Sequence, residues 1–250
     1  MNMKKILYIV SLVLTLSLPI SAENMKSAND AYAAGNYEEA IQIYENITQS
    51  GYESSTLYFN LGNAYYRTGK LAPSILNYER ALRLDADNVD AQHNLEFVRQ
   101  KTVDKIEPFA TIFFVKWIEE FRNIADSNKW AYVGVVFFII LVISLFLYIF
   151  GRRIWLKKTG FGLAIASLCF TAISLVFSYQ QKKALEDHST AIVFVPTATI
   201  KSSPDNSGTD LFVLHEGTKL TIKSVLGDWS EITTEDGNTG WILSKSIEKI

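Results

Sequence analysis

Two long apolar stretches, separated by a short basic segment, constrain this 250-residue chain more than any other feature. The stretches are residues 130–150 and 160–179, and neither contains a charged residue. Because an α-helix rises about 1.5 Å per residue, about 20 apolar residues cross a hydrocarbon core of about 30 Å. The segment between them, residues 151–159, carries two arginines and two lysines. We therefore predict a transmembrane hairpin whose flanking domains lie on the same side of one membrane.

The first 22 residues have the pattern of a secretory signal peptide. Lys4 and Lys5 precede an apolar run, residues 6–20, and the small residues Ser21 and Ala22 come directly after it. The run is short for a third membrane helix, which is the alternative. A signal peptide over residues 1–22 exports the domain on its C-terminal side, and the positive-inside rule keeps the basic loop 151–159 in the cytoplasm. Both arguments place the two soluble domains outside the cytoplasm.

Residues 23–103 repeat themselves at an offset of 34 residues. Asn29 recurs as Asn63 and Tyr44 recurs as Tyr78. A 34-residue period is that of the tetratricopeptide repeat, a pair of antiparallel helices. The segment Tyr58-x-x-Leu61-Gly62-x-x-Tyr65 resembles the signature of that family. We expect two repeats, followed by a closing cap helix.

Repeats of this kind bind peptides or protein surfaces in the concave face formed by their first helices. Tyr66 and Arg67 are the main candidate contacts, with inter-helix packing and a solvated charge as the respective alternatives. The full candidate set in the groove is Asn29, Tyr32, Phe59, Asn63, Tyr66, Arg67, His93 and Asn94.

Residues 107–124 connect the repeats to the first apolar stretch and place aromatic residues on one helical face. Phe113, Trp117 and Phe121 occur at four-residue spacing. Such a face beside a membrane span is typical of a helix that lies in the membrane interface. The alternative is that this face packs on the repeats or on the two spans.

Residues 190–250 change to short alternating runs broken by turn residues, a pattern of small all-β barrels. We expect six strands between residues 191 and 243. The segments Leu214-x-Glu216-Gly217-Thr218 and Asp236-Gly237-x-Thr239-Gly240-Trp241 resemble the bacterial-type SH3 domain. This resemblance implies binding of protein partners or cell-wall peptides, with Trp229 and Trp241 as candidate contacts.

Composition argues against several other functions. The formal charge of −2 disfavours nucleic-acid binding. A single cysteine, Cys169 within the second apolar stretch, forms neither an intramolecular disulfide nor a thiolate metal site, and three dispersed histidines do not suggest zinc. We assign no catalytic residue, no metal site and no cofactor, and we expect a protein that is not an enzyme.

The predicted fold class is a multidomain membrane protein with all-α tetratricopeptide hairpins, a two-helix transmembrane hairpin and a C-terminal all-β SH3-like barrel. The order of these parts is similar to the BatE family of the Bacteroides aerotolerance operons. That resemblance implies a scaffold in the bacterial inner (cytoplasmic) membrane with both soluble domains periplasmic. It also implies, as partners, membrane proteins with von Willebrand A domains and a MoxR-type ATPase system. The alternative function is a membrane anchor that binds peptidoglycan through its SH3-like domain.

Overall fold

The computed structural model describes residues 18–106 and 113–250. Residues 1–17 of the predicted signal peptide, and residues 107–112 of the predicted interfacial helix, lie outside the described residues. The first described helix, α2, begins at Leu18, so the last residues of the predicted signal peptide are helical and continuous with the first repeat.

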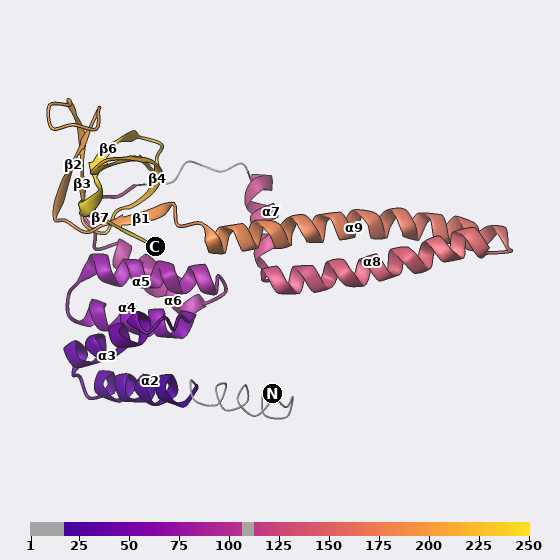
Figure 1. The fold of residues 1–250 in the computed structure, drawn as a ribbon, viewed down its shortest axis with the longest axis horizontal. Helices are drawn as coiled ribbons and strands as arrows, with labels where there is room; N and C mark the ends of the chain where they lie inside the picture. The colour runs from indigo at the N-terminus through magenta and orange to yellow at the C-terminus, as the bar shows by residue number, and fades with distance from the viewer. Residues whose placement is uncertain (1–17, 107–112) are drawn as a thin grey trace, which may run out of the picture. The chain divides into compact units, whose positions relative to one another are not determined.

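Five helices form the repeat region, and Figure 1 shows the first four one above another in chain order, with the fifth beside the fourth. They are α2 (Leu18–Ala33), α3 (Tyr37–Gln49), α4 (Ser55–Arg67), α5 (Leu71–Leu84) and α6 (Val89–Arg99). The first four make two helical hairpins, and α6 packs on α5 as the expected cap helix. A buried cluster that includes Tyr44, Ile47 and Leu57 fills the first hairpin and its junction with the second.

Local sequence signals set the helix ends. The Ser54 side chain accepts a hydrogen bond from Leu57 N, and the Asn88 side chain accepts one from Ala91 N, so each caps the start of the next helix. Gly35 and Gly69, one period apart, both have positive φ and end α2 and α4. The repeated turn is thus a direct product of the 34-residue period.

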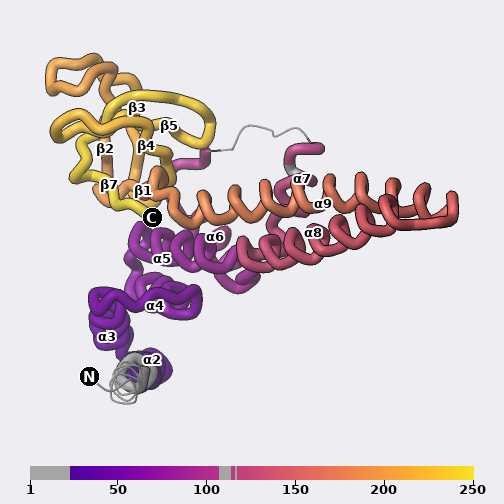
Figure 2. Tube along the Cα trace, turned by 45° about the vertical axis from the view of Figure 1, so that its right-hand side comes forward, coloured from indigo at the N-terminus to yellow at the C-terminus, as the bar shows by residue number. Residues whose placement is uncertain are grey.

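The described residues of the range 110–187 form a separate unit, which contains α7 (Phe113–Asn123), α8 (Ser127–Phe150) and α9 (Ile154–Glu186). Figure 2 shows α8 and α9 side by side. Both are long and apolar enough to cross a membrane. The helix α9 begins at Ile154, so residues 154–159 of the predicted loop are helical. Lysine is a good helix former, so the lysines in this segment did not indicate whether it is a loop or the start of a helix.

Small residues let α8 and α9 approach closely. A Cβ added at Gly160 would lie 2.9 Å from the main-chain oxygen of Ser144, so only glycine fits this crossing. The buried residues along the contact are mostly small: Gly134, Ser144, Gly160, Ala164, Ser167, Thr171 and Ser174.

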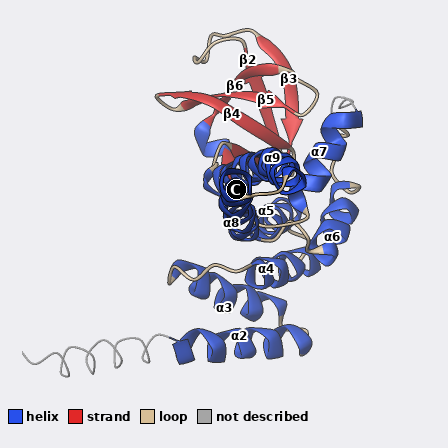
Figure 3. Cartoon of the chain, turned by 90° about the vertical axis from the view of Figure 1, so that its right-hand side faces the viewer, coloured by secondary structure: helices blue, strands red, loops and turns tan. Residues whose placement is uncertain are grey.

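The C-terminal region is an antiparallel sheet in the order β3-β2-β6-β5-β4-β1-β7, which Figure 3 shows curled on itself. The strands are β1 (Thr190–Val193), β2 (Thr197–Lys201), β3 (Asp210–His215), β4 (Lys219–Leu226), β5 (Trp229–Thr234), β6 (Thr239–Leu243) and β7 (Ile247–Lys249). Six were expected. The seventh, β7, is too short to show alternation and exists because it pairs with β1. A buried cluster including Ile200, Ile232 and Ile242 fills the interior.

The described residues of Met1–Phe109 and His188–Ile250 belong to a single compact unit. The repeats and the sheet, which the sequence places on either side of the apolar hairpin, therefore pack against each other. The predicted fold class is confirmed: helical repeats, two long apolar helices and a C-terminal antiparallel SH3-like sheet.

Candidate functional site

Two equivalent hydrogen-bond networks run along the first helices of the repeats. In the first, Asn29 Oδ1 accepts from the Tyr44 hydroxyl at 2.6 Å and from Asn60 Nδ2 at 3.1 Å. In the second, the equivalent acceptor is Asn63 Oδ1, and its donors are the Tyr78 hydroxyl at 2.6 Å and Asn94 Nδ2 at 2.8 Å. All six residues are related pairwise by the 34-residue offset. The networks link α2 to α4 and α4 to α6 across the candidate groove.

The tyrosines of these networks are buried, and their burial raises the pKa of both Tyr44 and Tyr78 to about 12. Their hydroxyls therefore stay neutral and donate throughout the physiological pH range. A cavity of about 230 Å³ opens beside the first network and is lined by Asn29, Tyr32, Tyr44, Asn60 and Asn63. Amide groups that line a cavity can exchange hydrogen bonds with a peptide backbone, because each amide both donates and accepts.

Aromatic rings pair with cations on α4 and near the end of α6. Tyr66 and Phe97 meet edge to face with ring centroids 5.8 Å apart, and the Lys101 ammonium lies 4.8 Å and 4.7 Å from their respective centroids. The exposed Arg67 guanidinium, also on α4, stacks 4.6 Å above the Tyr37 ring of α3. Cation–π contacts of this kind hold the long basic side chains in place while leaving them able to bind an anion.

The remaining groove candidates divide by burial. Phe59 is partly buried and packs against Tyr78 and two apolar clusters, so it stabilises the packing of the repeat helices. Tyr32 is partly buried and contacts Tyr37 edge to face. His93 is exposed on α6. The structure thus gathers the asparagines into networks and leaves Arg67 and His93 open to solvent.

The two tryptophans of the sheet lie on one face. Trp229 pairs with Leu243, and Trp241 pairs with Glu231, so alternation along β5 and β6 places both indoles diagonally on the same side. Both are half-buried, while the alternate residues Ser230 and Ile242 are buried inside the barrel. Leu226, paired with Trp229 from β4, extends this face and is exposed. We call Trp229, Trp241, Leu226 and Leu243 the tryptophan face.

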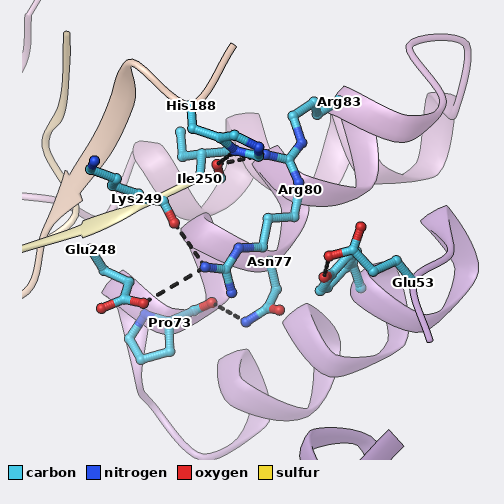
Figure 4. Close-up of polar contacts among 10 residues, drawn as sticks. Glu53, Pro73, Asn77, Arg80, Arg83, His188, Glu248, Lys249 and Ile250 are labelled. Carbon is cyan, nitrogen blue, oxygen red and sulfur yellow. Dashed lines mark hydrogen bonds and ion pairs between the residues drawn. The ribbon is translucent and has the colours of Figure 1, made fainter. Parts of the chain in front are cut away.

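An apolar interface joins the repeats to the sheet. Ile192 of β1 and Ile250 are buried in one cluster with Ile75, Leu76 and Val98 of the repeat region. The turn before β4 completes this contact: a Cβ added at Gly217 would lie 2.9 Å from Ile75 Cδ1. Figure 4 shows the polar edge of the same interface, where two arginines of α5 reach main-chain oxygens of the last residues. Arg80 donates to Lys249 at 2.7 Å and Arg83 donates to Ile250 at 2.6 Å.

Two carboxylates, one buried and one partly buried, add charge to the interface. Glu79 of α5 is 8% exposed and binds Arg99 at 2.5 Å and Lys219 of β4 at 2.8 Å. Asp104, just after the cap helix, accepts from the Thr218 hydroxyl at 2.6 Å, and from His215 N and Nδ1 at 2.7 Å and 2.8 Å. Burial by itself raises the pKa of the Asp104 carboxyl, but these hydrogen bonds outweigh burial and lower that pKa below its usual value.

Sequence reasoning missed three groove residues and the whole interface. Asn60 pairs with Asn94 at the same 34-residue offset that revealed Asn29 and Asn63, so that signal was available. Phe97 had no such signal, because the residue one period before it is Asn63, which is of another type. Lys101 lies one period after Arg67 and is also basic, so the offset could have indicated it. The interface joins residues on opposite sides of the apolar hairpin, which no local pattern connects.

Comparisons with known families agree with the two soluble folds. Residues 25–91 match the family model described as tetratricopeptide repeat, and residues 196–248 match the model described as bacterial SH3 domain. A search of curated proteins found no match to this chain. Domains of these two kinds are binding domains that typically lack catalytic activity, so the chain carries two modules suited to binding proteins, and the SH3 module is also compatible with cell-wall binding.

Proposed function

We propose that this protein is a non-enzymatic, membrane-anchored scaffold that binds protein partners through the joined repeat and SH3-like domains. The observation that carries the proposal is the packing of the two binding domains into one unit although about 80 residues, including two apolar helices, separate them in the chain. The domains share buried apolar side chains, so a partner that contacts both meets fixed geometry. Fixed geometry reduces the entropy lost on binding.

The same packing supports the proposed topology. Two domains that share a core must lie on the same side of a membrane, and the chain between them must then cross it an even number of times. The two helices α8 and α9 satisfy this condition. The basic residues Arg152, Arg153, Lys157 and Lys158 at the tip of the hairpin favour the cytoplasm for that end. Both soluble domains are therefore periplasmic, with the protein in the bacterial inner membrane.

The groove favours an extended partner segment that carries acidic groups. The asparagine networks supply amide donors and acceptors for a peptide backbone, and Arg67 and Lys101 supply the positive charge. By resemblance to the BatE family, the partners are membrane proteins with von Willebrand A domains and a MoxR-type ATPase system, in a complex that supports the envelope or tolerance of oxygen. The hairpin raises the effective concentration of the scaffold for such membrane neighbours.

Crosslinking in native membranes, followed by purification and mass spectrometry, tests this proposal. The variant Arg67→Glu with Lys101→Glu reverses the two groove charges and should lose at least tenfold of its crosslinked partner. The matched control is Lys223→Glu with Lys245→Glu, which makes the same change of net charge at exposed positions of the C-terminal domain. Equal partner yields from both variants would remove the groove from the proposed function.

A second candidate function is binding of peptidoglycan, favoured by the tryptophan face and the bacterial SH3 match. Its test uses the whole chain, because residues 190–250 alone would expose Ile192 and Ile250. Purified protein should sediment with peptidoglycan, and Trp241→Ala should abolish the sedimentation. If the protein stays in the supernatant, the wall-anchor function is rejected while the scaffold function stands.

A further inference from the structure

The helix α7 carries an apolar stripe that its contacts leave largely exposed. Trp117 is 67% exposed, and Ile118, Phe121 and Ile124 are also exposed. Trp117, Ile118 and Phe121 fall within one side of the helix because neighbours three and four apart share a face. Contiguous apolar surface is rarely left exposed to water, so the stripe indicates contact with a membrane or with another protein surface.

Hydrogen bonds fix the end of α7 against the ends of the two apolar helices. The Trp130 indole of α8 donates to the Arg122 main-chain oxygen at 2.8 Å. Gln181 Nε2 of α9 donates to the same oxygen and to Asn123 Oδ1, each at 3.1 Å. Both donors reach the main-chain oxygen of Arg122, which belongs to the last turn of α7, where carbonyl groups have no partner within the helix. The helix is therefore held at the level of Trp130 and Gln181, which is the same end of both apolar helices.

The apolar stripe is continuous with the aromatic surface at that end of the hairpin. Ring centroids are 6.4 Å apart from Trp117 to Phe121, 5.8 Å from Phe121 to Trp130 and 5.1 Å from Trp130 to Phe177. Tyr132 of α8 and Tyr179 of α9 are 72% and 68% exposed within two residues of this cluster. Tryptophan and tyrosine at the ends of apolar helices mark the boundary between hydrocarbon and water in a bilayer.

We infer that α7 lies in the interfacial zone of the phospholipid bilayer, with Trp117, Ile118 and Phe121 inserted among the lipids at the end of the hairpin where the chain joins the soluble domains. This inference rests on the membrane anchoring proposed above. The sequence of α7 has two basic and two acidic residues, so its charge is zero. Apolar insertion rather than charge attraction holds the helix, and its position does not depend on anionic lipid or on salt.

Nitroxide scanning of the full chain in phosphatidylcholine vesicles tests the inference. Cys169 is first replaced by Ser, and single cysteines at positions 117, 118, 119 and 121 are then labelled one at a time. Labels at 117, 118 and 121 should collide more often with oxygen, which concentrates in lipid, than with a water-soluble nickel complex. The label at 119, on the other side of α7, should show the reverse preference, and addition of anionic lipid or salt should change neither result.

Two outcomes would overturn the inference. Preference for the nickel complex at all four positions would mean that α7 lies in water, and low collision with both reagents at 117, 118 and 121 would mean that the stripe is covered by protein. A label at Val142, exposed in the middle of α8, separates these failures from failure of the anchor itself. If Val142 reports lipid while 117 reports water, only the interfacial placement fails; if Val142 also reports water, the proposed membrane hairpin fails.

Discussion

Ile192→Ala measures how strongly the sheet supports the repeats. Ile192 belongs to β1 and is 0% exposed, yet it packs against Ile75, Leu76 and Val98 of the repeat region. The change removes three carbon groups, each worth about 0.8 kcal/mol of transfer free energy, or about 2.4 kcal/mol together. A residual cavity adds to this loss, and the total falls within the range of about 2–5 kcal/mol observed for such truncations. We expect about 3 kcal/mol.

Hydrogen exchange, measured by mass spectrometry on the full chain in lipid nanodiscs, gives the loss of stability separately for each helix. Because about 1.4 kcal/mol is a tenfold change in an equilibrium constant, amides of α5 and α6 that are protected by the interface should exchange about 100-fold faster. The matched control is Ile47→Ala, at 2% exposure in the first repeat, which should speed exchange in α3 and leave β1 unchanged. Faster exchange confined to the strands in Ile192→Ala would refute the view that the two domains stabilise each other.

Three further changes probe individual contacts. Glu79→Gln removes the buried carboxylate that pairs with Arg99 and Lys219. Because both cations are partly exposed, thermal unfolding should show that the free energy of unfolding falls by about 1–3 kcal/mol. Asp104→Asn should destabilise near neutral pH by about 1–3 kcal/mol. The pKa of Asp104 is lower in the folded than in the unfolded protein, so its contribution to the free energy of unfolding is full above the unfolded pKa of about 4 and disappears as pH falls through the folded pKa. The stabilities of the variant and the wild type, measured against pH, should therefore converge at low pH. A constant difference between them would contradict this account. Gly62→Ala places a Cβ 2.8 Å from the Tyr78 ring and should cost about 1–3 kcal/mol by circular dichroism melts, whereas no change would show that the two helices can move apart freely.

The order and type of the elements were predictable from the sequence because each rests on a local or periodic signal. The 34-residue period predicted the pairing of α2 with α3 and of α4 with α5, and alternation predicted six of the seven strands. Helix bounds at the hairpin were less predictable. The helix α9 continues to Glu186, seven residues past the last apolar residue of the second stretch, because backbone hydrogen bonding within a helix does not require apolar side chains.

The sequence by itself determined that the chain has helical repeats, two apolar helices and a small barrel, since periodicity, length and turn residues are properties of neighbouring residues. Only the tertiary structure decided that the repeats and the barrel form one unit. Ile75 and Ile192 are 117 positions apart in the chain, and each has the local pattern of an ordinary core residue of its own domain. Burial of both in one cluster depends on shape complementarity between two surfaces, which neither segment encodes alone.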